Sequence, residues 1–240
     1  MNYGKLYLIP TPLGDYDPAE VLPAPVLDKI QDLDRYVVEE LRTARRFLSR
    51  AGLKGRIEAL TLRELNEHTD PADVEQMVSL FADGHDVGLL SEAGLPAVAD
   101  PGALLVALCH RRGIEVVPFT GPSSLMLALM ASGLNGQRFA FVGYIPAKSE
   151  ERRSAIKALE KRSAAAHETQ ILIETPYRND ALFADMLQVL SPATQLCIAA
   201  DLTLPTQYIK TLPVAGWRRS PLTIGKRPCV FILLATDNRI

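Results

Sequence analysis

Short apolar runs alternate with longer amphipathic stretches along most of this chain. Apolar runs of four to eight residues are typical of buried strands, and the stretches between them have helical spacing. The predicted strands span residues 5–9, 36–39, 57–62, 87–90, 115–118, 138–145, 170–174, 196–200, 229–235 and, as an edge strand, 206–211. The predicted helices span 26–33, 41–51, 73–83, 103–112, 125–131, 148–165 and a last stretch ending at Leu190. Strands that alternate with helices predict an α/β protein.

Turn-forming residues are concentrated at residues 133–137, GLNGQ, between two of these predicted elements. Such a stretch is typical of a domain boundary. We therefore expect two α/β domains, residues 1–135 and 136–240. Each is expected to hold a mostly parallel or mixed sheet flanked by helices.

The most informative stretch is residues 87–101, VGLLSEAGLPAVADP. A buried strand leads into a loop of small residues, and Asp100 and Pro101 are typical of the start of the helix that follows. A strand, a small-residue loop and a capped helix form ligand crevices in open α/β sheets. The alternative is an ordinary connection without a ligand. The length of the loop and its carboxylates, Glu92 and Asp100, favour ligand binding.

A second loop of this kind follows the next strand. Residues 119–124, FTGPSS, open the helix at 125–131 and place Ser123 and Ser124 at its N-terminus. Free backbone N–H groups there suit a carboxylate or a ribose, although serines in this position often only cap the helix. Two such loops after consecutive strands indicate a shared pocket.

Composition narrows the class of protein. The 240 residues are 48% hydrophobic with a net charge of -2, and no apolar run or leader pattern suggests membrane insertion or secretion, so we expect a soluble cytoplasmic protein.

Cys109, Cys197 and Cys229 are far apart and lie in apolar runs, which predicts buried reduced thiols. Seven basic residues and one acidic residue lie between Arg42 and Arg63. This segment is either a solvated helix face or a phosphate-contacting patch.

Several common catalytic motifs are absent from the sequence. The first strand is not followed by G-x-G-x-x-G, and there is no P-loop, H-E-x-x-H, paired C-x-x-C or G-x-S-x-G. Dinucleotide oxidoreductases, P-loop NTPases, metal hydrolases and serine hydrolases therefore have no support. No metal site is expected.

Three motifs carry a resemblance to a known family. They are PTPLGD at residues 10–15, SEAGLPAVADPG at 91–102 and FTGPSS at 119–124, with weaker matches at 38–42, 66–68 and 138–146. In this order they resemble the tetrapyrrole methylase superfamily over roughly residues 5–180. Within it, they are most similar to the branch that methylates a cytidine 2′-hydroxyl of small-subunit ribosomal RNA.

The resemblance implies S-adenosylmethionine (SAM) as methyl donor, bound in the cleft between the two domains, and a homodimer. The first domain would supply the substrate side and the donor loops, and the second would complete the SAM site. The residues implied to contact SAM are Pro12, Leu13, Ser91, Glu92, Ala93, Gly94, Leu95, Pro96, Val98, Ser123, Ser124, Tyr177 and Ala200.

Transfer to a ribose hydroxyl also requires a group that takes up the hydroxyl proton. The candidates, in order of preference, are Glu92, Asp100, Glu39 and His68. If the acceptor is ribosomal RNA or the small ribosomal subunit, the basic segment implies phosphate contacts by Arg42, Arg45 and Arg46.

The sequence also departs from the ribosomal RNA pattern. Glu40 and Leu41 stand where that pattern has aspartate and threonine, and a lysine and a glutamate of its C-terminal part are lost after Ala200. Three functions therefore stay open: methylation of ribosomal RNA ribose, methylation of a tetrapyrrole or other metabolite, and SAM binding without activity. The basic segment favours RNA as the acceptor. The loss of the lysine and the glutamate favours a metabolite as acceptor or SAM binding without activity.

Overall fold

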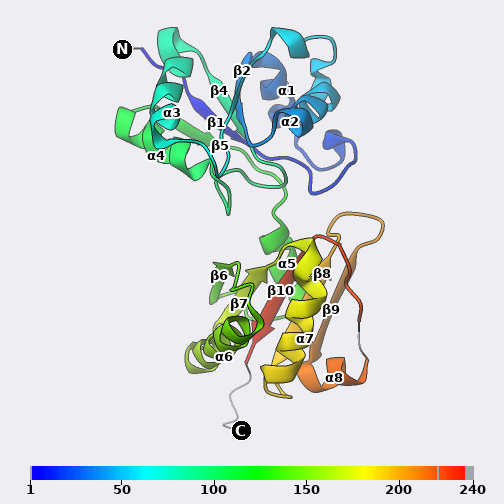
Figure 1. Ribbon diagram of the computed structural model, residues 1–240. Helices are drawn as coiled ribbons and strands as arrows, with labels where there is room; N and C mark the ends of the chain where they lie inside the picture. The colour runs from blue at the N-terminus through cyan, green and yellow to red at the C-terminus, as the bar shows by residue number, and fades with distance from the viewer. Residues whose placement is uncertain (1, 221, 236–240) are drawn as a thin grey trace. The chain divides into compact units, whose positions relative to one another are not determined.

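The computed structural model describes residues 2–220 and 222–235. The chain forms two compact units, Met1–Ser123 and Ser124–Ile240 (Figure 1). The predicted boundary near residue 135 therefore falls inside the second unit, one helix later than this division. The reason is that helix α5 (Ser124–Ser132) packs against β8, β9 and β10 of the second sheet.

The first unit contains a five-stranded sheet in the order β3-β2-β4-β1-β5, in which every neighbouring pair is parallel. Its strands are β1 (Leu6–Ile9), β2 (Arg35–Val38), β3 (Thr61–Glu64), β4 (Val87–Leu90) and β5 (Val116–Pro118). The carboxyl ends of parallel strands lie at one edge of a sheet. The loops after β2, β4 and β1, the three central strands, therefore meet there.

Helices cover both faces of this sheet (Figure 1). They are α1 (Ala24–Asp32), α2 (Leu41–Leu48), α3 (Pro71–Gln76) and α4 (Ala103–Arg112). Successive residues of a strand point to opposite faces. Val37 and Leu89 accordingly pack against α3 and α4, whereas Tyr36 and Leu90 pack against α1 and α2. Burial on both faces explains why these strands are continuous apolar runs.

The second unit contains a mixed sheet in the order β6-β7-β10-β8-β9, in which only β6 and β7 pair in parallel. Its strands are β6 (Phe139–Gly143), β7 (Thr169–Ile173), β8 (Gln195–Ala200), β9 (Tyr208–Pro213) and β10 (Cys229–Leu234). β9 lies at the edge, as its weak apolar alternation predicts.

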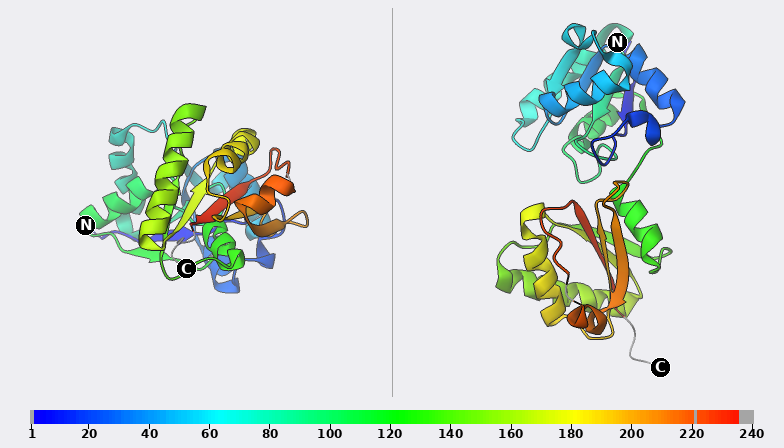
Figure 2. Two further views of the ribbon diagram at one scale, coloured as in Figure 1. Left: turned by 90° about the horizontal axis from the view of Figure 1, so that it is seen from below. Right: turned by 90° about the vertical axis from the view of Figure 1, so that its right-hand side faces the viewer.

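One face of this second sheet packs against α6 (Ser149–Ala166), α7 (Asn179–Val189) and α8 (Val214–Arg219), while α5 lies on the other face (Figure 2). Trp217 of α8 is buried against Phe183 of α7, with ring centroids 5.5 Å apart in an edge-to-face arrangement. Each unit thus consists of a sheet flanked by helices, which confirms the predicted α/β fold class.

A network of ion pairs holds α6 to α7. The buried Asp185 carboxylate accepts hydrogen bonds from Arg152 Nε at 2.8 Å, Arg153 Nε at 2.6 Å and Ser149 Oγ at 3.1 Å. Burial opposes ionisation, but these three donors outweigh it, so the pKa of Asp185 is lowered. The network therefore holds a charged carboxylate inside the second unit.

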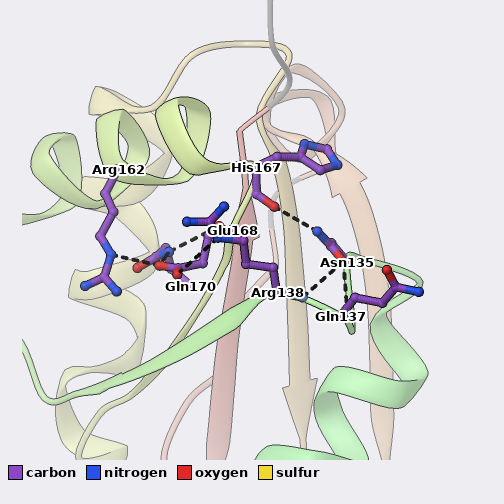
Figure 3. Close-up of polar contacts among 7 residues, drawn as sticks. All are labelled: Asn135, Gln137, Arg138, Arg162, His167, Glu168 and Gln170. Carbon is purple, nitrogen blue, oxygen red and sulfur yellow. Dashed lines mark hydrogen bonds and ion pairs between the residues drawn. The ribbon is translucent and has the colours of Figure 1, made fainter.

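The turn at residues 133–137 is anchored within the second unit (Figure 3). Asn135 Nδ2 donates to the carbonyl of His167 at 2.8 Å, and Asn135 Oδ1 accepts from Gln137 N at 3.0 Å. His167 ends α6 with a left-handed φ of 49°. These contacts join the start of β6 to the α6–β7 turn, so the turn is an internal part of the unit.

Two predicted elements differ from the structure, and one helix was not predicted. The strand expected at 57–62 is a 3-10 turn over Ile57–Ala59 followed by β3, and the helix expected at 73–83 becomes a 3-10 helix over Met77–Gly84. α8 was not predicted. β3 is largely exposed and is held by its pairing with β2, so hydrophobic patterning does not mark it.

The three cysteines are free and buried. Burial raises the pKa of both Cys109 and Cys229 to about 12, which keeps them as thiols. This confirms the predicted buried thiols. Within the described residues, no helix combines the length and apolar character required to cross a bilayer.

Candidate active site

The loops after β1 and β4 are hydrogen-bonded to each other. Thr11 N donates to Gly94 O at 2.9 Å, and Gly94 N donates to Thr11 O at 3.1 Å. Thr11 Oγ1 also donates to Ser91 O at 3.3 Å. Parallel pairing of β1 with β4 ends both strands at the same edge, which brings these two loops together. Two motifs far apart in the sequence thus form one surface.

A cavity of about 280 Å³ lies beside this pair of loops. Five predicted donor residues line it, namely Pro12, Leu13, Ser91, Glu92 and Ala93. The opposite wall comes from α2 and the turn after it, through Thr43, Ala44, Arg46, Phe47 and Arg50. Gly94, Leu95, Pro96 and Val98 belong to the same loop but do not line this cavity.

Two of the candidate bases are directly connected. Glu92 N donates to Glu39 Oε2 at 3.3 Å, and Thr43 Oγ1 donates to Glu92 Oε1 at 2.5 Å. Burial, followed by the nearby charges of Asp100 and Glu92, raises the pKa of Glu39 despite that backbone hydrogen bond. Glu92 is the exposed member of the group and the one that lines the cavity.

Asp100 organises the loop that contains Glu92. Its Oδ1 accepts hydrogen bonds from Ala97 N at 3.0 Å and Gly102 N at 2.7 Å. Ala97 and Ala99 have left-handed φ values of 65° and 55°, which cost on the order of 1–3 kcal/mol each in non-glycine residues. Asp100 Oδ2 is buried and accepts no hydrogen bond from any described residue. The structure therefore brings Glu39, Glu92 and Asp100 together.

His68 lies apart from this group, after the edge strand β3. Its side chain is 83% exposed, with Nε2 3.5 Å from Glu67 Oε1. It lines a different cavity, together with Arg63 and Asp70. The structure does not bring His68 to the residues that line the first cavity.

The remaining predicted donor residues lie at the end of the first unit and in the second. Ser123 ends the first unit and Ser124 begins α5. Tyr177 is 80% exposed, with Lys226 Nζ 5.1 Å from its ring centroid, and Ala200 is buried at the end of β8. A donor site in the cleft between the two domains stays a prediction.

The three predicted RNA-binding arginines are exposed on α2. The helix is capped by Glu40, whose carboxylate accepts from Arg42 N at 2.8 Å and Thr43 N at 2.7 Å. These two hydrogen bonds lower the pKa of Glu40. In the part of the chain that the structure describes, no carboxylate lies within 4.0 Å of the guanidinium of Arg42 or Arg45, so their charges face solvent.

Several residues of the cavity were not predicted from the sequence. Thr43 has no catalytic motif around it, and its role follows only from its contact with Glu92. Asp15 and Arg50 also line the cavity and form an ion pair. Asp15 lies in the PTPLGD motif, which is the one signal that points to it. Among the described residues, no group of three or more His, Cys, Asp or Glu side chains is arranged to hold a metal ion.

Comparisons with known proteins agree with this architecture. The ribosomal RNA small subunit methyltransferase I of Escherichia coli O157:H7 is 34% identical over 213 residues, which are 89% of this chain and 70% of that protein. The crystal structure of the methyltransferase CobJ superposes with a TM-score of 0.65 at 15% identity, covering 97% of this chain and 95% of that one. Uroporphyrin-III C-methyl transferase from Thermus thermophilus, complexed with S-adenyl homocysteine, gives 0.57 at 18% identity, covering 96% and 97%.

The fold is therefore that of two-domain α/β methyltransferases. Residues 5–216 match the model for tetrapyrrole (corrin/porphyrin) methylases, and the chain belongs to this family. It is a SAM-dependent methyltransferase. The resemblance carried by the sequence motifs is thus confirmed.

The residues of the cavity fit this donor. Ser91 is 9% exposed, and its Oγ has no hydrogen-bond partner among the described residues. A buried hydroxyl without a partner is costly, which a polar ligand atom in the cavity would relieve. The small residues Ala93 and Gly94 allow a close approach to the backbone.

Proposed function

We propose that this protein transfers the methyl group of SAM to a ribose 2′-hydroxyl of small-subunit ribosomal RNA. The observation that carries the proposal is that Arg46 and Arg50 line the same cavity as Ser91 and Glu92. A cationic surface suited to an RNA backbone therefore adjoins a carboxylate and the loop expected to hold the donor. The name of the E. coli relative, 34% identical to this chain, supports the same acceptor.

SAM, when bound, supplies a methyl group already activated by a positively charged sulfur. Pro12, Leu13, Ser91 and Ala93 would hold it, with Ser91 Oγ as a polar contact. The family resemblance also implies donor contacts by Ser123, Ser124, Tyr177 and Ala200. The task of these residues is to orient donor and acceptor and to exclude water.

In this proposal Glu92 is the general base. It is exposed in the cavity, and the Thr43 hydroxyl orients its Oε1. The proton of the ribose hydroxyl would pass to a carboxylate oxygen of Glu92 as the methyl–oxygen bond forms, while the sulfur–methyl bond of the donor breaks and S-adenosylhomocysteine leaves. Glu39 and Asp100 act as positioning residues, because they bind the backbone of the loop that contains Glu92.

The arginines of α2 would contact the RNA backbone. Arg42, Arg45 and Arg46 are exposed on the first turns of a helix whose neighbouring acid, Glu40, is engaged in capping. Each phosphate contact that is lost should weaken RNA binding and reduce its salt slope by about 0.7 on a single strand. These residues would position the RNA without selecting its sequence.

We also propose that the protein acts in the cytoplasm as a homodimer. Met126 and Met130 of α5 are 42% and 78% exposed, which is unusual for large apolar side chains on a helix otherwise rich in buried residues. This face is a candidate part of the dimer contact. A monomeric mass by light scattering at micromolar concentration would contradict the dimer.

The acceptor is tested by mapping ribose methylation on small-subunit ribosomal RNA from cells with and without this gene. The proposal predicts one 2′-O-methyl group that is lost on deletion and restored by the wild-type gene but not by Glu92→Gln. An identical methylation map in all strains would contradict ribosomal RNA as the acceptor and would favour a metabolite instead.

A further inference from the structure

An acidic side chain lies between two arginines at the edge of the cavity. Asp15 Oδ1 forms an ion pair with Arg50 Nη1, and Arg46 Nη2 lies 3.8 Å from the same oxygen. All three side chains are substantially exposed, at 57% for Asp15, 43% for Arg50 and 61% for Arg46. The hydrogen bond from Arg50 is the main cause that lowers the pKa of Asp15, so this carboxylate is charged at neutral pH.

Among the residues that the structure describes, Asp15 is the one acid whose carboxylate is within 4.0 Å of an α2 arginine or Arg50. Glu40 directs its carboxylate to the backbone at the start of α2, and Glu92 accepts a hydrogen bond from Thr43. Asp15 therefore provides the local counter-charge of an otherwise cationic helix. It belongs to the loop after β1, not to α2, so the contact joins two elements of the cavity wall.

We propose that Arg46 and Arg50 form a binding site for a phosphodiester oxyanion of the RNA substrate, and that Asp15 fills this site as an internal anion in the free protein. The inference rests on the proposed function, since it assigns the RNA contact made at that same cavity. Arg46 and Arg50 line the cavity together with Glu92. A phosphate held there would bring its attached ribose to the cavity in which the candidate base lies.

The exchange of carboxylate for phosphate is energetically reasonable. Exposed ion pairs contribute little to stability, so little is lost when Asp15 leaves the two arginines. A phosphodiester gains hydrogen bonds from two guanidinium groups and releases counterions from the RNA. Asp15 then acts as a competitor that weakens binding of RNA lacking further contacts.

The test compares Asp15→Asn with Glu75→Gln, a matched control. Glu75 is likewise an exposed carboxylate shared by two arginines, Arg111 at 2.7 Å and Arg112 at 2.8 Å, but it does not line the cavity. Both substitutions remove one negative charge. Binding of a single-stranded RNA oligonucleotide from small-subunit ribosomal RNA, and of SAM, is measured for each protein at two salt concentrations, with thermal melting as a check on folding.

Asp15→Asn is expected to tighten RNA binding about fivefold, the equivalent of about 1 kcal/mol, while SAM affinity stays unchanged. Glu75→Gln should change RNA binding by less than about twofold. Arg50→Gln should weaken RNA binding and reduce the salt slope by about 0.7. In the Arg50→Gln background, Asp15→Asn should improve the free energy of RNA binding by less than half of the amount that it does in the wild-type protein.

Other outcomes would overturn the inference. Equal effects of Asp15→Asn and Glu75→Gln would show that only net charge matters. Tighter SAM binding with unchanged RNA binding would assign the arginines to the donor carboxylate. If Asp15→Asn leaves RNA binding unchanged or weakens it, Asp15 does not act as an internal anion. This result would not contradict the proposed function. A wild-type protein that binds no RNA at either salt concentration would contradict the proposed function itself.

Discussion

Thr43 donates a hydrogen bond from Oγ1 to Oε1 of Glu92 at 2.5 Å, which joins the first turn of α2 to the loop after β4. The carbonyl of Glu40 lies farther from the same hydroxyl, at 3.2 Å. A hydroxyl has a single proton to donate, so the shorter contact fixes its direction toward Glu92. The helix that carries the exposed arginines thus also orients the candidate base.

Glu92→Gln should lower the rate of methyl transfer by about 10²–10⁴-fold, the usual contribution of a general base. Glutamine keeps the size of the side chain and can still accept from Thr43, but it cannot take up a proton at neutral pH. SAM affinity, measured by calorimetry, should change little. A variant with the wild-type single-turnover rate would exclude Glu92 as the base.

Thr43→Val should lower kcat about tenfold with little change in KM, because a hydrogen bond to a charged group contributes about 1.5–3 kcal/mol and part of this is replaced by water. Thr43→Ser, which keeps the hydroxyl, is the control and should restore most of kcat. Equal losses in the two variants would indicate a packing role for Thr43 and not a positioning role.

Ser91→Ala should weaken SAM binding about two- to tenfold, the range for one neutral hydrogen bond. It should leave the free energy of unfolding unchanged or slightly higher, because it removes a buried hydroxyl that has no partner in the described part of the protein. Calorimetry and urea unfolding on the same sample separate the two effects. Unchanged SAM affinity would remove Ser91 from the donor site.

Gly94 is less suitable for testing the donor site. Its φ is +81°, and a Cβ there would lie 3.2 Å from Leu13 Cδ2. Any side chain at this position strains the backbone, and a β-branched one does so most. A Gly94 variant would therefore lose stability as well as SAM binding, so Ser91 is the cleaner choice.

Glu39→Gln should raise the melting temperature at pH 7. The pKa of Glu39 is raised above its ordinary 4.5, chiefly by burial and then by the charges of Asp100 and Glu92. A carboxyl of this kind stabilises the fold most below its ordinary pKa, and this contribution is lost as pH rises through the raised value. The advantage of Glu39→Gln should therefore disappear toward pH 4. A difference independent of pH would contradict this explanation.

Asp185→Asn should lower the free energy of unfolding by about 3–5 kcal/mol, because it leaves the buried Arg152 without a counter-charge. Arg153 is 43% exposed, so Arg153→Gln should cost only about 1 kcal/mol. The pKa of Asp185 is lowered from 3.8, so its contribution is present above that value and is lost as pH falls below it. Urea unfolding at pH 7 and in acid measures both effects.

Much of the fold could be predicted because burial marks the central strands. The run at 87–90 coincides with β4, and the helix at 103–112 coincides with α4. The edge strand β3 and the short helix α8 were misplaced or missed, since neither forms a long apolar pattern. Strand order was not predictable, because it depends on contacts between distant residues.

The candidate site was predicted in part for the same reason. Glu39 and Glu92 follow adjacent parallel strands, β2 and β4, so strand pairing brings them together. His68 follows the edge strand and lies apart from them. The role of Thr43 follows only from a side-chain contact across the fold, which no local pattern encodes. Asp15 lies in the PTPLGD motif, but its ion pair with Arg50 could not be predicted from the sequence.

The most direct test of the central claim is methyl transfer by the purified protein from labelled SAM to small ribosomal subunits, followed by digestion of the RNA to nucleosides. We predict label in a single 2′-O-methylated nucleoside with the wild-type protein, and a rate reduced by about 10²–10⁴-fold with Glu92→Gln. Label on a base, or no label in RNA while a tetrapyrrole or another metabolite is methylated, would contradict the claim.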